Sequence, residues 1–232
     1  MFSIKLFKKY CSNEWLPIFE LNKKVITVKA KQRIFTEGES VDGIYFIEHG
    51  KVKVLSRFNA AEEKIIRLAG DGMVVGHRGI NVKKYPISAE AMTDCTLTFV
   101  PINSFMKILK ANPELAVYLI KFMSDELRES EDRMKNLLIS DPKKRVALIV
   151  VKLIDDFGYD NSNNSKLAFT LSRSEMANMS GLTYETIIRT LSFFEEQGFI
   201  SFIGKEIVIK DETKLRMLSE DKSSKKNSLQ KN

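Results

Sequence analysis

The segment between residues 168 and 210 restricts the fold of this 232-residue chain more than any other part of it. Two short helical patterns flank Gly181, which stands where a tight turn between two helices requires a positive φ. Ser172 or Ser174 can cap the first helix, and Thr183 can cap the second, because hydroxyl oxygens accept hydrogen bonds from the free N–H groups of a first turn. The pattern predicts two short helices joined by a tight turn.

A β-type hairpin follows this helix pair. The second helix is expected to run to about Gln197 and to stop at Gly198. Residues 200–202 and 206–209 then form two strand-like runs around Gly204-Lys205. Helix, turn, helix and hairpin wing together predict a winged helix-turn-helix, a unit that binds duplex DNA.

The second helix of this unit has one apolar and one polar side. Its buried stripe is expected at Ile187, Thr190, Leu191 and Phe194. Tyr184, Glu185 and Arg189 lie off that stripe, and we expect them to contact bases, since arginine pairs with guanine and glutamate accepts from cytosine. A solvated i,i+4 ion pair is the alternative for Glu185 and Arg189, and the surrounding motif favours base contact.

Hydroxyl and basic side chains at the helix starts and in the wing are candidates for contacts with phosphate groups. They are Ser172, Arg173, Ser174, Thr183 and Lys205. Capping alone would explain the hydroxyl groups equally well.

Residues 113–138 have the pattern of a long helix with a heptad seam. The seam positions are Ala116, Ile120, Met123, Leu127, Ser130, Met134 and Leu137. Because charged residues surround this narrow apolar stripe, self-pairing into a dimer is favoured over packing on the chain's own sheet.

The ends of the helices have their own signals. Asn112 before a proline indicates an N-cap, and the proline in Asp141-Pro142 interrupts the long helix, which places a hinge at 139–142. A further helix is expected over 142–157, and the polar stretch 159–166 is expected to be a loop.

Residues 24–101 carry short β-rich runs separated by glycines and turns. The runs are VITVKA, RIFTEG, IYFIEHG, KVKVLSRF, EKIIRLAG, MVVGH, PISAEAM and TLTFVP. Many short strands at this spacing predict a barrel or a jelly roll.

Composition narrows the class of protein. The net charge of +7 favours an anionic partner such as nucleic acid. No apolar run is long enough to span a membrane and no signal peptide is apparent, so we expect a cytoplasmic protein without a membrane partner.

The two cysteines, Cys11 and Cys95, cannot build a disulfide framework or a four-thiolate cluster. No catalytic motif is present, and we expect no enzyme and no metal site.

The chain resembles the cyclic-AMP receptor protein/FNR (Crp/Fnr) family of bacterial regulators. Gly38-Glu39, Ile44-Tyr45-Phe46-Ile47, Gly50-Lys51-Val52, Gly70-Asp71 and Ser88-Ala89 match its barrel, and Gly181-Leu182-Thr183-x-Glu185-Thr186-Ile187-x-Arg189 matches its recognition helix. The resemblance implies a cyclic-nucleotide-binding-type β-roll (a double-stranded β-helix or jelly roll), a long dimerisation helix and a winged helix-turn-helix. It also implies Glu185 and Arg189 as base readers, in homodimers on a palindromic operator.

The residues that would bind an effector in the β-roll differ from those of this family. Members that bind cyclic AMP have a glutamate after the cassette glycine and an arginine before Ser-Ala, whereas this chain has His77 and Ile87 there. Gly76, His77, Arg78 and Ser88 are nevertheless the candidate effector pocket, for an unidentified small molecule or for none. A lone histidine such as His77 is more often structural than a haem ligand.

The expected architecture is α+β in four parts. They are a β-roll sensor domain with an N-terminal helix (1–112), a dimerisation helix (113–140), a winged helix-turn-helix domain (141–218) and a disordered basic tail (219–232). We predict a homodimeric DNA-binding transcription regulator that does not respond to cyclic AMP and requires no cofactor. An activator would also contact RNA polymerase, but no motif for that contact can be read. The alternative is a nucleotide-binding module that controls a partner protein without binding DNA.

Overall fold

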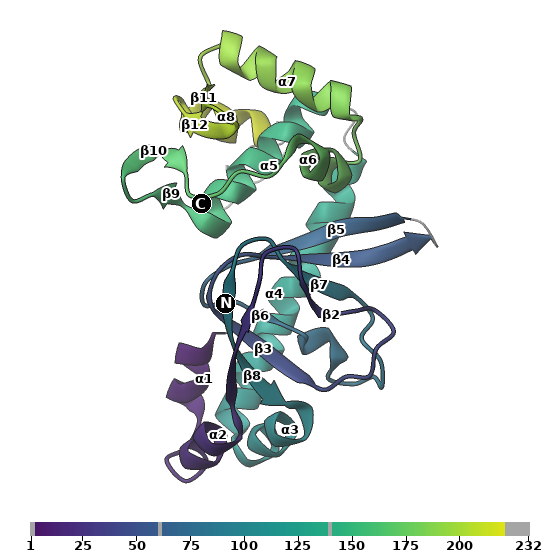
Figure 1. The fold of residues 1–232 in the computed structure, drawn as a ribbon, viewed down its shortest axis with the longest axis vertical. Helices are drawn as coiled ribbons and strands as arrows, with labels where there is room; N and C mark the ends of the chain where they lie inside the picture. The colour runs from purple at the N-terminus through teal and green to yellow at the C-terminus, as the bar shows by residue number, and fades with distance from the viewer. Residues whose placement is uncertain (1–2, 60–61, 139–140, 221–232) are drawn as a thin grey trace, which may run out of the picture. The chain divides into compact units, whose positions relative to one another are not determined.

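The computed structural model describes residues 3–59, 62–138 and 141–220, and it divides into two compact units, residues 1–130 and 131–232 (Figure 1). Residues 139–140 of the expected hinge at 139–142, and nearly all of the expected tail, lie outside the described residues. The boundary between the units falls inside the long helix α4 (Pro113–Leu137). Each unit is described by itself.

Two antiparallel four-stranded sheets form the roll of the first unit, with strand orders β1-β8-β3-β6 and β2-β7-β4-β5. The strands are β1 (Lys24–Val28), β2 (Arg33–Phe35), β3 (Gly43–His49), β4 (Val52–Asn59), β5 (Glu62–Ala69), β6 (Val74–Val75), β7 (Ser88–Ala91) and β8 (Cys95–Pro101). Each β-rich run predicted from the sequence overlaps one of these strands, so the predicted jelly roll is confirmed.

The turn between β3 and β4 shows why one of the roll's glycines is needed. Gly50 has a φ of 114°, a conformation that side chains with a Cβ rarely adopt. A Cβ there would lie 2.5 Å from Cys95 Sγ, so the chain can pass so close to β8 only without a side chain.

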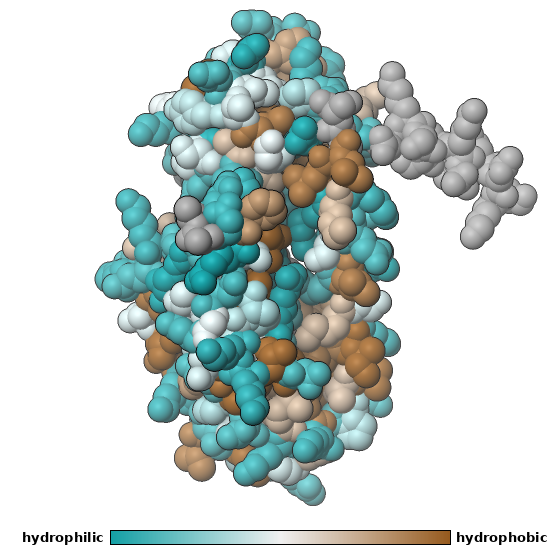
Figure 2. All heavy atoms as spheres, turned by 90° about the vertical axis from the view of Figure 1, so that its right-hand side faces the viewer, coloured by the Kyte–Doolittle hydropathy of each residue, from teal (hydrophilic) through white to brown (hydrophobic). Residues whose placement is uncertain are grey.

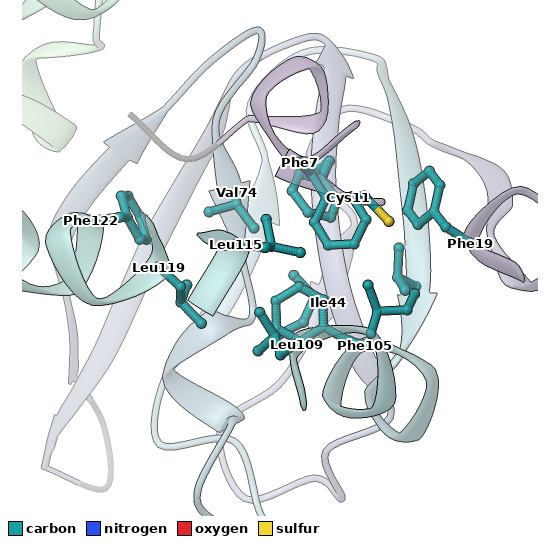
Figure 3. Close-up of a cluster of buried hydrophobic side chains, with 13 residues drawn as sticks. Phe7, Cys11, Phe19, Ile44, Val74, Phe105, Leu109, Leu115, Leu119 and Phe122 are labelled. Atoms are coloured by element: carbon teal, nitrogen blue, oxygen red, sulfur yellow. The ribbon is translucent and has the colours of Figure 1, made fainter. Parts of the chain in front are cut away.

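Four helices complete this unit and share one apolar core. Besides α4, they are α1 (Ile4–Tyr10), α2 (Leu16–Asn22) and α3 (Ile102–Ala111). Figure 3 shows Phe7 of α1, Phe19 of α2, Phe105 of α3 and Leu115 of α4 gathered around Ile44 of β3. The helix α3 was not predicted, because its apolar residues follow β8 directly with no polar break.

The long helix has two apolar stripes, of which the sequence analysis identified only the outer one. Its inner stripe, Leu115, Leu119, Phe122 and Glu126, is buried against the roll. Met123, expected in the dimer seam, is partly buried and packs on the same core. Asn112 stands at the expected N-cap position, where its carbonyl accepts from Ala116 N–H, but its side chain accepts from Ser12 N–H and donates to the Ile108 carbonyl.

The second unit is built from helices and a small antiparallel sheet. Its elements are α5 (Pro142–Phe157), α6 (Arg173–Ser180), α7 (Tyr184–Glu196), α8 (Glu212–Ser219), β9 (Tyr159–Asp160), β10 (Asn163–Leu167), β11 (Ile200–Ile203) and β12 (Glu206–Ile209), with strand order β11-β12-β10-β9.

The expected loop at 159–166 is wrong, because these residues form most of β9 and β10. They have little intrinsic strand preference, but β12 offers a free edge and Lys166 pairs with Val208 across it. The Lys166 ammonium also reaches Asp160 at 3.0 Å and Glu206 at 2.9 Å, one on each side. Cross-strand contacts outweigh local preference here.

Candidate nucleic-acid interface

The helix pair α6–α7 is fixed at each end by a specific cap. The Ser172 hydroxyl accepts from Glu175 N–H at 3.2 Å, and the Glu175 carboxylate accepts from Ser172 N–H at 3.0 Å, which is a full capping box. Gly181 has a φ of 66°, as predicted for the turn. Thr183 caps α7 by accepting from Thr186 N–H at 3.2 Å. Both helices therefore start at fixed residues, which fixes what their first turns expose.

The helix α7 presents one side to its own core and the other to solvent. Ile187, Thr190, Leu191 and Phe194 are buried, as the sequence pattern predicted. Tyr184, Glu185 and Arg189 are all exposed and lie within the first two turns of the helix. The structure thus brings the three predicted base-contacting side chains to one accessible helix end.

The wing is tied to the start of α6 by an arginine. Lys205 is exposed at the tip between β11 and β12, next to Gly204 with a φ of 61°. Arg173 Nη1 donates to the Lys205 carbonyl at 2.9 Å, and the guanidinium lies 4.9 Å from the centre of the Phe202 ring. Two predicted phosphate-contacting residues therefore meet in space, and Ser172, Ser174 and Thr183 are exposed on the same two helix starts.

The candidate effector cassette lies in the first unit at a short 3-10 helix, η1 (His77–Gly79). Gly76 precedes it with a φ of 85°. His77 is buried, and Arg78 is partly exposed. Both face the carboxylate of Glu126 on α4, with His77 Nε2 at 3.6 Å and Arg78 Nη2 at 3.8 Å from Oε2. The cassette therefore meets an anion supplied by the chain itself.

Ser88, the last candidate of the cassette, has different partners. Its hydroxyl accepts from Glu37 N–H at 2.9 Å and lies 3.4 Å from the Glu63 carboxylate. A cyclic phosphate needs cations and N–H donors around it, whereas here the carboxylates of Glu126 and Glu63 lie beside the candidate residues. The chain's own carboxylates therefore stand beside the residues that would meet the phosphate of a cyclic nucleotide.

The sequence analysis did not identify two residues of the cluster around the Glu126 carboxylate. One is Glu126 of α4 itself, and the other is Arg67 of β5, whose Nε lies 3.0 Å from Glu126 Oε1. Each is a charged residue inside an apolar pattern: Arg67 in EKIIRLAG, and Glu126 on the stripe of Leu115, Leu119 and Phe122. A charge on a buried stripe needs a partner of opposite sign, and that signal could have paired them.

The buried histidine should make stability depend on pH. Burial lowers the pKa of His77, as do Arg67 and Arg78, and these outweigh the opposite effect of Glu126. In the unfolded chain a histidine takes up a proton near pH 6.5, while folded His77 stays neutral to lower pH. Its contribution is therefore complete above that pH and is lost as the pH falls towards the lower, folded pKa.

We expect His77→Gln to flatten the loss of unfolding free energy between pH 7 and 5 by up to about 1.4 kcal/mol per pH unit. Urea denaturation at several pH values measures this slope. His49→Gln, at an exposed site, is the matched control. Equal slopes for His77→Gln and the parent chain would show that His77 takes up its proton at the same pH in the folded and the unfolded chain.

The described residues form neither a membrane-spanning helix nor a cluster of metal-ligating side chains. Within residues 3–59, 62–138 and 141–220, none of the helices combines the length and the hydropathy that a membrane span requires. No group of three or more histidine, cysteine or acidic side chains is placed to hold a metal ion among the residues the structure covers.

Comparisons with known proteins agree with this arrangement. Residues 25–112 match the family model of the cyclic nucleotide-binding domain, and residues 144–218 match that of the Crp-like helix-turn-helix domain. The chain is 28% identical over 200 residues to the transcriptional activator protein anr of Pseudomonas aeruginosa, covering 86% of this chain and 82% of that one. It is 26% identical over 183 residues to a CRP-like cAMP-activated global transcriptional regulator of Mycobacterium tuberculosis, covering 78% and 82%.

Among solved structures, FixK2 from Bradyrhizobium japonicum has the same fold, with a TM-score of 0.77 at 24% identity over 86% of this chain and 98% of that one. Both halves of the chain, the roll and the helix-turn-helix, thus match the same group of regulators. The chain belongs to the Crp/Fnr family and is a DNA-binding transcription regulator, not an enzyme.

Proposed function

We propose that the chain regulates transcription in the cytoplasm as a homodimer whose two α7 helices read the half-sites of a palindromic operator. The observation that carries this proposal is the exposed first half of α7, where Glu185 and Arg189 share one face four residues apart. Arginine can form a bidentate contact with guanine, and glutamate can accept from cytosine on the other side of the groove. Tyr184 extends the same face.

The outer stripe of α4 supports the dimer. Ile120, Leu127 and Met134 recur every seven residues and expose 67%, 62% and 68% of their surface, and Leu137 is exposed as well. Hydrophobic side chains reach the surface among hydrophilic ones in Figure 2. Because the inner stripe already packs on the roll, the outer stripe is free to pair with the same stripe of a second copy.

We further propose that cyclic AMP does not control this regulator, because the cassette faces Glu126 and Ser88 lies beside Glu63. Contact with RNA polymerase is part of the proposal for an activator, the role named for the Pseudomonas relative. The alternative, a module that controls a partner protein without DNA, leaves the exposed face of α7 without a role.

Selection of duplexes from a random pool by the full chain tests the function. We expect a two-fold symmetric consensus with half-sites about 10 base pairs apart, the separation of one helical turn. Retention of the selected duplex at moderate salt should not change on adding cyclic AMP. A chain that retains no duplex even at low salt would favour the alternative instead.

The contact between Arg173 and the wing leads to a separate prediction. Arg173→Ala removes the bond to the Lys205 carbonyl, so amide exchange in residues 201–206 should speed up. Affinity for all duplexes should fall, and the salt dependence should become shallower by about 0.9 per protomer if a phosphate contact is also lost.

Arg173→Lys keeps the charge but not the forked guanidinium, so it separates the two roles. We expect Arg173→Lys to restore the salt dependence while the wing still exchanges fast. Unchanged exchange in both variants would show that Arg173 does not hold the wing.

A further inference from the structure

A buried carboxylate lies on the inner face of α4, where only apolar side chains would be expected. Glu126 follows Leu115, Leu119 and Phe122 on the stripe that packs against the roll, and it is 8% exposed. Taking a carboxylate out of water costs several kcal/mol unless cations and hydrogen-bond donors receive it. The roll must therefore supply its partners.

Nitrogen groups from two segments of the roll converge on this carboxylate. Arg67 Nε of β5, 5% exposed as a residue, lies 3.0 Å from Oε1. From η1, His77 Nε2 and Arg78 Nη2 lie 3.6 and 3.8 Å from Oε2. Arg67 is held in place by its own bond from Nη1 to the Val74 carbonyl at 2.9 Å. The groups are arranged around one anion rather than as separate pairs.

The site also has unused capacity for hydrogen bonding. Among the described residues, Glu126 Oε2 and both ring nitrogens of His77 have no hydrogen-bond partner, although these atoms are buried. The edge of Phe122 lies against the His77 ring, with centroids 5.0 Å apart, and closes that side. A small movement that shortens the 3.6 Å between His77 Nε2 and Glu126 Oε2 would give both atoms a hydrogen-bond partner.

We infer that Arg67, His77 and Arg78 form an anion site within the roll whose resident occupant is the Glu126 carboxylate of the same chain. The chemical class of ligand is a small monocarboxylate, here attached to the protein. A soluble phosphate would have to displace this carboxylate, because two anions within 4 Å of each other repel strongly at low dielectric.

The resident carboxylate also sets the rotation of α4. Glu126 and Leu127 are neighbours, so fixing Glu126 to the roll turns Leu127 and the rest of the outer stripe away from it. The site thereby fixes this helix to the roll with no small molecule added.

Chemical rescue tests the assignment without DNA, so its outcome does not depend on the proposed regulatory function. Glu126→Ala leaves two arginines around a gap, and we expect its Tm to fall by about 10 °C. Sodium formate or acetate at about 100 mM should restore a large part of this loss, since it binds only the folded variant. Sodium chloride at equal ionic strength should not, and the parent chain should not respond to formate. Glu131→Ala removes an exposed carboxylate from the same helix and should leave Tm unchanged.

Glu126→Gln covers the case in which Glu126→Ala does not fold. The amide fills the same space without charge, so Gln should lower Tm as well and prevent rescue by formate. A Glu126→Ala chain as stable as the parent, or one that gains no more from formate than from chloride, would overturn the inference. So would a Gln variant with the Tm of the parent chain.

Discussion

Leu127→Glu is expected to convert the chain to a monomer and to abolish operator binding while each unit stays folded. Leu127 lies at the centre of the outer stripe of α4, between Ile120 and Met134, and it is 62% exposed in the single chain. The substitution therefore removes nothing from the core of the roll.

The size of the effect follows from symmetry, because each substitution occurs twice in a dimer. Burying one leucine at an interface contributes about 1.5–3 kcal/mol, so losing two contributes about 4 kcal/mol, a roughly 1000-fold rise in the dimer Kd. The two carboxylates would also face each other across the seam, beside a helix that already carries Asp125 and Glu129. A monomer holds only one half-site, so operator affinity falls with dimer affinity.

Sedimentation velocity and gel shift measure both effects on the same samples. Leu21→Glu is the matched control, since Leu21 is 85% exposed but lies on α2. It should leave dimer and operator affinity as they were. If Leu127→Glu remains a dimer that binds its operator, the outer stripe of α4 is not the interface.

The sequence predicted the helix-turn-helix well because its signals are local. Ser172, Gly181 and Thr183 act on the few residues next to them, and caps and turns need no distant partner. The α7 stripe was also correct, since a helical period places its own buried side. The strands β9 and β10 were missed for the opposite reason: their stability comes from β12, about forty residues later in the chain.

The candidate effector cassette also shows that contacts between distant residues are hard to predict from sequence. The cassette at His77 and Arg78 could be located through the family resemblance, but its partner on α4 lies about fifty residues further on. A heptad seam on α4 could be predicted, yet two stripes on one helix overlap in sequence, and only the roll determines which is inside. A charge within an apolar stripe requires a buried partner of opposite sign, so recognising Glu126 as such a charge would have predicted that partner.

Arg189→Ala is expected to lower affinity for the specific operator by about 1–3 kcal/mol per half-site, while binding to unrelated duplex changes little. Arg189 is exposed on α7, so its removal leaves the helix and its buried stripe intact. Selectivity should relax at one G·C position in each half-site, because the guanine there loses its two hydrogen bonds. Competition gel shifts with operators altered at single positions measure this directly.

Lys205→Ala is the comparison that distinguishes a base contact of Arg189 from a phosphate contact. We propose that Lys205, exposed at the wing tip, contacts phosphate and no base edge, so its loss should weaken all duplexes alike and make the salt dependence shallower. Glu185→Ala should resemble Arg189→Ala, because it changes which base is preferred and leaves nonspecific affinity in place. If Arg189→Ala lowers affinity for every duplex equally, as expected for Lys205→Ala, then Arg189 contacts the backbone and the base contacts must come from elsewhere on α7.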